Sequence, residues 1–139
     1  MKKALIIYNS RKGTTKKLGE EIGNFLHTKN ISSKVIPIYD FDEKETDEYD
    51  YVLLGCWTSG LFVIMQHPQK DWINFTKRLP NLKRKKVGLF TTYKLATGSM
   101  FKKMRIPLVD KAGNINLELK SRNGLLSNSD TEELIKFVG

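Results

Sequence analysis

Cysteine is nearly absent from this chain, since Cys56 is the only one among its 139 residues. A single thiol excludes a disulfide within the chain and suits a reducing compartment. Apolar runs long enough to cross a bilayer are missing as well. The apolar part of MKKALIIYNS (1–10) is too short for a signal peptide and has no small-residue cleavage site. We therefore expect a cytoplasmic protein with no segment in the membrane.

Two nucleotide-binding patterns are also absent. Gly-x-x-x-x-Gly-Lys-Ser/Thr does not occur, which argues against hydrolysis of a nucleoside triphosphate. Gly-x-Gly-x-x-Gly does not occur either, which argues against a dinucleotide Rossmann site. His27 and His67 lie far apart in the sequence, and we predict neither metal binding nor acid–base catalysis by either of them.

Positive charge exceeds negative charge, with 24 Lys and Arg against 15 Asp and Glu and a formal net charge of +9. Acidic residues are concentrated in DFDEKETDEYD (40–50), so the rest of the chain is more basic than the total indicates. Such a charge favours nucleic acid, an anionic surface or an anionic small molecule as a partner. No predicted helix gathers basic and aromatic residues as a recognition helix would, so we expect no nucleic-acid partner.

Apolar segments alternate with helical patterns along the whole chain. We predict strands at 4–8, 33–39, 51–55, 86–92 and 114–119, and helices from residue 14, over 71–79, over 98–108 and over 127–138. Buried strands joined by helical crossovers predict one α/β domain over residues 1–139, with a parallel sheet covered on both faces. Pro37 cannot donate to a strand ladder, so its strand is expected at the edge of the sheet. Ser99 and Ser129 are the expected N-caps of the last two helices.

The first strand ends in a polar loop, and a helix begins directly after it. Ligands of such sheets bind beyond the carboxyl ends of the strands, and a helix N-terminus holds phosphate through its N–H groups and partial positive charge. The loop supplies hydroxyls, a glycine that lets the backbone approach an anion, and two cations, in Ser10, Arg11, Lys12, Gly13, Thr14 and Thr15. The alternative is an ordinary loop in which Thr14 or Thr15 caps the helix.

The third and fourth strands deliver aromatic residues and hydroxyls to the same end of the sheet. GCWTSGLF (55–62) follows the third strand, and FTTYKLATGSMF (90–101) contains the end of the fourth. A flat, partly apolar ligand with a phosphate group suits such a combination, because aromatic faces can stack on it and backbone N–H groups can bind its polar rim.

These loops resemble those of the flavodoxins. YNSRKGTT is similar to the phosphate loop of that family, LLGCWTSG and LFTTYKLATGSM to its second and third loops, and LELKSRNGLLSNSDTEELIKFV to its last strand and helix. The resemblance covers nearly the whole chain. It implies a flavodoxin-like five-stranded parallel sheet of order 2-1-3-4-5 with helices on both faces, non-covalently bound FMN and a role in electron transfer.

The resemblance also implies which residues bind FMN. The first loop would hold the phosphate. Thr58, Ser59 and Gly60 would run along one side of the ring system, and either Trp57 or Tyr93 would stack on it. The complete expected set is Ser10, Arg11, Lys12, Gly13, Thr14, Thr15, Trp57, Thr58, Ser59, Gly60, Thr91, Thr92, Tyr93, Lys94, Thr97 and Gly98. The chain departs from the family pattern in two places: Lys12 replaces a hydroxyl residue, and Ser59 stands where many flavodoxins have tryptophan.

The largest departure from the family pattern is the net charge, because typical flavodoxins are strongly acidic and this chain is basic. Arg11, Lys12 and Lys94 lie on the predicted site loops, where cations should favour the anionic, fully reduced form of FMN. We therefore predict a higher potential for the second electron than in an acidic flavodoxin. A basic surface also implies that the redox partners present an acidic docking face.

The leading hypothesis is a monomeric electron carrier that takes electrons from a reductase and passes them to an acceptor enzyme, with no catalytic residue of its own. One alternative is a small FMN-dependent reductase that acts directly on a quinone-like substrate. Another is a flavodoxin-like binding domain that has lost its cofactor.

Overall fold

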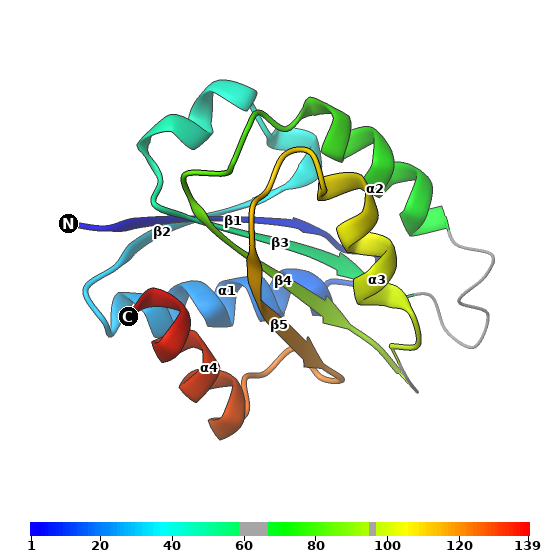
Figure 1. The fold of residues 1–139 in the computed structure, drawn as a ribbon. Helices are drawn as coiled ribbons and strands as arrows, with labels where there is room; N and C mark the ends of the chain where they lie inside the picture. The colour runs from blue at the N-terminus through cyan, green and yellow to red at the C-terminus, as the bar shows by residue number, and fades with distance from the viewer. Residues whose placement is uncertain (59–66, 95–96) are drawn as a thin grey trace.

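The fold is known from a computed structural model that describes residues 1–58, 67–94 and 97–139 (Figure 1). Its strands and α-helices, in chain order, are β1 (Lys3–Asn9), α1 (Thr14–His27), β2 (Ser32–Pro37), β3 (Tyr51–Trp57), α2 (His67–Arg78), β4 (Lys86–Thr92), α3 (Met100–Arg105), β5 (Ile115–Ser121) and α4 (Asn128–Val138). Short 3₁₀ helices occupy η1 (Ile38–Asp40), η2 (Glu43–Glu48) and η3 (Ile106–Leu108). In the part of the chain that the structure describes, no helix is long and apolar enough to cross a membrane.

The strands form one parallel sheet of order β2-β1-β3-β4-β5. Helices α1 and α4 cover one face of this sheet, and α2 and α3 cover the other (Figure 1). The predicted fold class is therefore confirmed. The strand that contains Pro37 lies at the edge, as its missing N–H donor requires.

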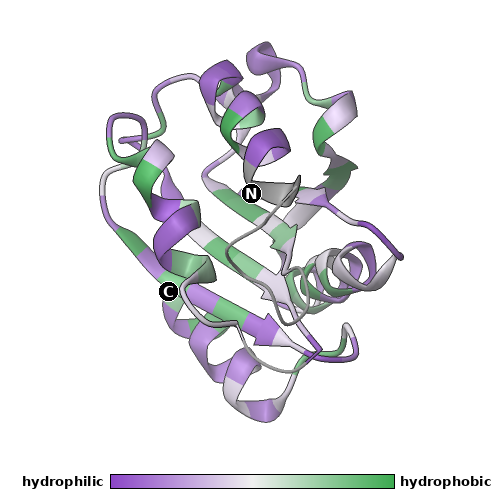
Figure 2. Ribbon diagram, turned by 90° about the vertical axis from the view of Figure 1, so that its right-hand side faces the viewer, coloured by the Kyte–Doolittle hydropathy of each residue, from purple (hydrophilic) through white to green (hydrophobic). Residues whose placement is uncertain are grey.

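Alternate residues of the central strands supply two separate hydrophobic cores. Leu5 and Leu54 pack with Trp72 on the α2 and α3 side, while Ile6 and Leu53 pack toward α1 and α4. Because successive side chains of a strand point to opposite faces, a strand buried on both faces must be a continuous apolar run. Figure 2 shows this pattern, with hydrophobic residues along the strands and mixed residues on the surrounding helices.

Several predicted boundaries were wrong by a few residues. The second strand ends at Pro37 rather than at residue 39, because the chain turns there into η1. The third strand continues to Trp57, and α2 begins at His67 rather than at residue 71. The fifth strand runs to Ser121 and alternates between buried and exposed residues, as expected of an edge strand with one covered face.

The predicted cap at Ser129 was also wrong. Ser127 is the N-cap of α4, since its Oγ accepts a hydrogen bond of 3.1 Å from the Asp130 N–H, and Asp130 Oδ2 accepts one of 2.9 Å from the Ser127 N–H. This reciprocal capping box needs an acceptor three residues after the cap, which Asp130 provides for Ser127. Ser99 does occupy the N-cap of α3, but its side chain makes no capping hydrogen bond.

Gly55 in β3 leaves room for the ring of Phe90 in β4 to lie over it, on the α1 and α4 side of the sheet. The two residues are paired in register, and Phe90 is fully buried. A Cβ atom on Gly55 would lie 2.1 Å from Phe90 Cε2, well inside the distance of any normal contact. Only a residue without a side chain therefore fits at this point in the centre of the sheet.

We predict that Gly55→Ala lowers the free energy of unfolding by about 1–3 kcal/mol, because the added methyl group overpacks the core. Urea denaturation followed by far-ultraviolet circular dichroism measures the change. Gly113→Ala is the matched control, since its Cβ would meet only the carbonyl oxygen of Lys83 at 3.8 Å. Equal stability of the Gly55→Ala and Gly113→Ala proteins would contradict the prediction.

Candidate functional site

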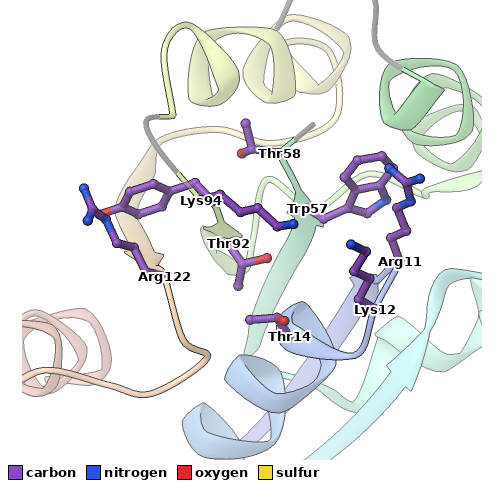
Figure 3. Close-up of a pocket in the computed structure, with 9 residues that line it drawn as sticks. Arg11, Lys12, Thr14, Trp57, Thr58, Thr92, Lys94 and Arg122 are labelled. Atoms are coloured by element: carbon purple, nitrogen blue, oxygen red, sulfur yellow. The ribbon is translucent and has the colours of Figure 1, made fainter. Parts of the chain in front are cut away.

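A pocket opens at the carboxyl end of the sheet, where four neighbouring strands end. It encloses about 220 Å³ and is lined by Arg11, Lys12, Thr14, Trp57, Thr58, Thr92, Tyr93, Lys94 and Arg122 (Figure 3). These residues come from the ends of β1, β3, β4 and β5 and from the start of α1. This is the end of an open α/β sheet at which ligands bind.

The first loop brings the start of α1 to the pocket. Gly13 is the N-cap of α1 and has a φ of 93°, a left-handed conformation that side chains disfavour. Its N–H donates a hydrogen bond of 3.0 Å to Ser10 Oγ. No side chain caps the helix, and its first turn has no acidic residue, so the alternative in which Thr14 or Thr15 is the cap was wrong. The partial positive charge of the helix N-terminus therefore remains available to an anion.

Buried threonine hydroxyls join the strand ends next to the pocket. Thr15 Oγ1 and Thr92 Oγ1 lie 2.6 Å apart, and Thr58 Oγ1 and Thr91 Oγ1 lie 2.8 Å apart. The Thr91 hydroxyl also donates a hydrogen bond of 2.6 Å to the carbonyl oxygen of Cys56. These contacts fix the start of α1 and the end of β3 against the end of β4.

Two aromatic side chains, both partly buried, lie on the pocket wall. The guanidinium carbon of Arg11 lies 5.2 Å from the ring centroid of Trp57, and that of Arg122 lies 5.4 Å from the ring centroid of Tyr93. Lys120 Nζ is also 6.0 Å from the Tyr93 ring. Both rings are therefore in cation–π range of an arginine.

Cations converge inside the pocket. The ammonium groups of Lys12 and Lys94 point toward each other (Figure 3). The nearby side chain of Lys94, and after it the positive charge of Arg11, lowers the pKa of Lys12. No carboxylate is among the described residues that line the pocket. A bound anion would relieve this repulsion between like charges.

The structure places the predicted site residues in three groups. The pocket is lined by Arg11, Lys12, Thr14, Trp57, Thr58, Thr92, Tyr93 and Lys94. The remaining described residues of the predicted set are not among those that line it, namely Ser10, Gly13, Thr15, Thr91, Thr97 and Gly98. Ser59 and Gly60 lie outside the described residues.

Arg122 lines the pocket but was missed by the sequence reasoning, which considered only the loops after the first, third and fourth strands. The available signal was its position directly after the fifth strand, in LELKSRNG. Because β5 runs parallel to β4, its carboxyl end meets the same end of the sheet. A cation directly after β5 is therefore expected to lie near the pocket.

Cys56 offers no reactive thiol to the site. Its side chain is completely buried, and Asn9 Nδ2 donates a hydrogen bond of 3.8 Å to its sulfur. Burial raises the pKa of the Cys56 thiol to about 12, so the thiol stays protonated at neutral pH. Within residues 1–58, 67–94 and 97–139, no group of three or more His, Cys, Asp and Glu side chains could hold a metal ion.

The family model described as Flavodoxin domain matches residues 5–113 of this chain. The chain therefore belongs to the flavodoxin domain family, whose members bind FMN and transfer electrons. The resemblance seen in the sequence is thus confirmed.

Solved flavodoxin structures match nearly the whole chain. Flavodoxin 2 from Bacillus cereus is 23% identical with a TM-score of 0.74, over 97% of this chain and 94% of that one. The two-electron reduced flavodoxin of Megasphaera elsdenii is 21% identical with a TM-score of 0.74, over 96% of both chains. A flavodoxin from the domain Archaea is 24% identical with a TM-score of 0.64, over 97% of this chain and 92% of that one. At these identities, the likeness establishes the fold.

We predict that Thr92→Val lowers the free energy of unfolding by about 1–3 kcal/mol, because it leaves the buried Thr15 hydroxyl without its partner. The double variant Thr15→Val, Thr92→Val should lose less than Thr92→Val alone, since both polar groups are then removed together. Urea denaturation of the wild-type protein, both single variants and the double variant gives the coupling energy. Additive losses would show that the 2.6 Å contact does not stabilise the fold.

Proposed function

We propose that this chain binds FMN in the pocket at the carboxyl end of the sheet and carries electrons from a reductase to an acceptor enzyme. The main support is the convergence of four cations and two aromatic rings on one pocket whose described lining contains no carboxylate. A phosphate-bearing, flat, partly apolar molecule satisfies both sets of side chains at once.

The phosphate would be held where Lys12 and Lys94 face each other. Thr14 lies in the first turn of α1 and lines the same pocket, so its hydroxyl and the N–H groups of that turn are available as donors. A phosphate dianion between the two ammonium groups would turn mutual repulsion into two charge-assisted contacts. These residues fit the phosphate end of FMN.

The ring system would be held by Trp57 and Tyr93. Each aromatic side chain has two faces, so a ring that contacts an arginine on one face can stack on a ligand with the other. The described cavity of about 220 Å³ is smaller than the roughly 300–1,000 Å³ of many ligand sites. The side chains of Lys12 and Lys94 reach into it, and their rearrangement would make more room (Figure 3).

The chemistry of the proposed carrier, one- and two-electron transfer, is supplied by FMN when it is bound. The described residues that line the pocket include no carboxylate, histidine or thiol that could hold and move a proton near neutral pH. The contribution of this chain is therefore to bind, to orient and to set the local electrostatic potential. A protein that binds and orients FMN without a proton-transferring side chain of its own is better suited to carry electrons than to act as an enzyme on a separate substrate.

We predict that Lys12→Ala and Lys94→Ala each weaken FMN binding about tenfold, or about 1.4 kcal/mol, because each removes a charged donor to the phosphate. Quenching of flavin fluorescence during titration measures Kd. Riboflavin, which lacks the phosphate, is the internal control, and its Kd should change less than about twofold. Lys83→Ala removes the same charge near the amino end of β4 and should leave both values unchanged.

Several outcomes of that titration would contradict the proposal. A wild-type protein that binds neither FMN nor riboflavin would favour a flavodoxin-like domain without a cofactor. Equal weakening of FMN and riboflavin in the two lysine variants would show that Lys12 and Lys94 do not contact the phosphate.

We predict that Lys94→Glu lowers the reduction potential of the FMN-loaded protein for the second electron. The wild-type cation stabilises added negative charge nearby, whereas a carboxylate opposes it. Redox titration followed by visible absorption measures the potential, and Lys83→Glu provides the same change in net charge away from the pocket. An unchanged or raised potential in Lys94→Glu would refute the prediction.

A further inference from the structure

The turn between β5 and α4 lies against the first turn of α1. A Cβ atom on Gly124 would lie 2.9 Å from the carbonyl oxygen of Thr14 and 3.1 Å from both Cβ and Cδ of Lys17. Gly124 is buried and has a φ of 80°, a left-handed conformation that side chains disfavour. The backbone of this turn therefore lies so close to the start of α1 that only glycine fits between them.

Hydrogen bonds within the turn restrict its backbone. Ser121 Oγ, at the end of β5, accepts a hydrogen bond of 3.0 Å from the Gly124 N–H and donates one of 2.8 Å to the carbonyl oxygen of Leu125. Asn123 Oδ1 accepts a hydrogen bond of 3.0 Å from the Leu125 N–H, the pattern of an Asx turn. Two residues further on, the capping box of Ser127 begins α4. The position of Gly124 is thus fixed from within its own segment.

The same segment is attached to one aromatic residue of the pocket. The Tyr93 N–H donates a hydrogen bond of 3.2 Å to the carbonyl oxygen of Ser121. Tyr93 follows β4 and lines the pocket, whereas Gly124 does not line it. The turn therefore contacts both the start of α1 and the backbone of a ring-stacking candidate from outside the pocket.

A displaced Thr14 carbonyl would move a donor of the proposed phosphate site. The carbonyl oxygen of Thr14 and the N–H of Thr15 belong to one planar peptide group and point in opposite directions. The first N–H groups of a helix have no partner within the helix, so the Thr15 N–H is one of those available to an anion. A side chain at position 124 that pushed on this carbonyl would therefore tilt the peptide group and redirect its N–H.

We infer that Gly124 is a positioning residue for the phosphate of FMN, because the turn after β5 sets the position of the first turn of α1. This inference rests on the proposed binding of FMN. Gly124 would act only through Thr14 and Thr15. Lys12 and Lys94 would supply charge to the phosphate, whereas the turn would determine how accurately the N–H groups of the helix meet it.

The test separates the phosphate from the ring system of the ligand. Gly124→Ala should raise the Kd for FMN about fivefold and the Kd for riboflavin less than about twofold, because only the phosphate end is displaced. Quenching of flavin fluorescence measures both values. Gly55→Ala is the structural control, since its Cβ would also lie too close to a neighbour, 2.1 Å from Phe90 Cε2, but within the core. It should leave the ratio of the two Kd values unchanged, so lost stability alone would not explain a changed ratio.

Asn123→Ala tests the turn without adding an atom to it. This change removes the acceptor of the Leu125 N–H from an exposed side chain, so the protein should still fold. The Kd for FMN should rise about threefold, with less change for riboflavin. Asn123→Ser keeps a hydroxyl acceptor for the same N–H and should restore most of the wild-type affinity. A wild-type ratio of the two Kd values in both Gly124→Ala and Asn123→Ala would overturn the inference.

A second measurement needs no FMN. In the ¹H–¹⁵N spectrum of the ligand-free protein, Gly124→Ala should shift the cross-peaks of residues 14–17 more than those of residues 24–27 at the other end of α1, and Gly55→Ala should not. If the wild-type protein binds no FMN, the proposed function fails, and unshifted cross-peaks would show that the turn does not position α1 either. If the wild-type protein binds FMN and the ratio of Kd values stays unchanged in the variants of the turn, the inference about Gly124 fails by itself.

Discussion

Parallel pairing of the strands is the constraint on which the rest of this molecule depends. Asn9 pairs with Cys56, Trp57 with Thr92, and Thr92 with Ser121. The carboxyl ends of β1, β3, β4 and β5 therefore lie at the same level of the sheet. The loops that follow must then leave the sheet at the same end. Side chains more than a hundred residues apart in the sequence, such as Arg11 and Arg122, come to border one pocket for this reason.

This arrangement has an electrostatic cost in the absence of a ligand. Lys12 is close enough to Lys94 and Arg11 for their charges to lower its pKa, and its own protonation is therefore opposed. The buried hydroxyl pair of Thr15 and Thr92 helps to keep the start of α1 at the end of β4 and so works against separation of the cations. A site that is held together while its charges repel one another is already organised for an anion.

Much of the fold, but less of the site, could be predicted from the sequence. The apolar runs 4–8 and 51–55 predict buried parallel strands because no other common arrangement hides both faces, and Pro37 marks an edge strand. Side-chain direction is harder to predict. Thr91 and Thr92 are neighbours in one strand and so face opposite sides of the sheet, and only Thr92 lines the pocket. The position of Arg122 directly after the fifth strand was its one sequence signal, and the parallel pairing of β5 with β4 brings it to the pocket.

The positive charge of this site bears on how the protein would hold reduced FMN. In a flavodoxin, acidic residues around FMN would oppose the added negative charge of reduction, whereas Lys94 and its neighbours would favour it. The same cations would attract anionic groups to this end of the sheet. A flavodoxin with cations in this position would therefore hold the negative charge of reduced FMN more readily than one with carboxylates there.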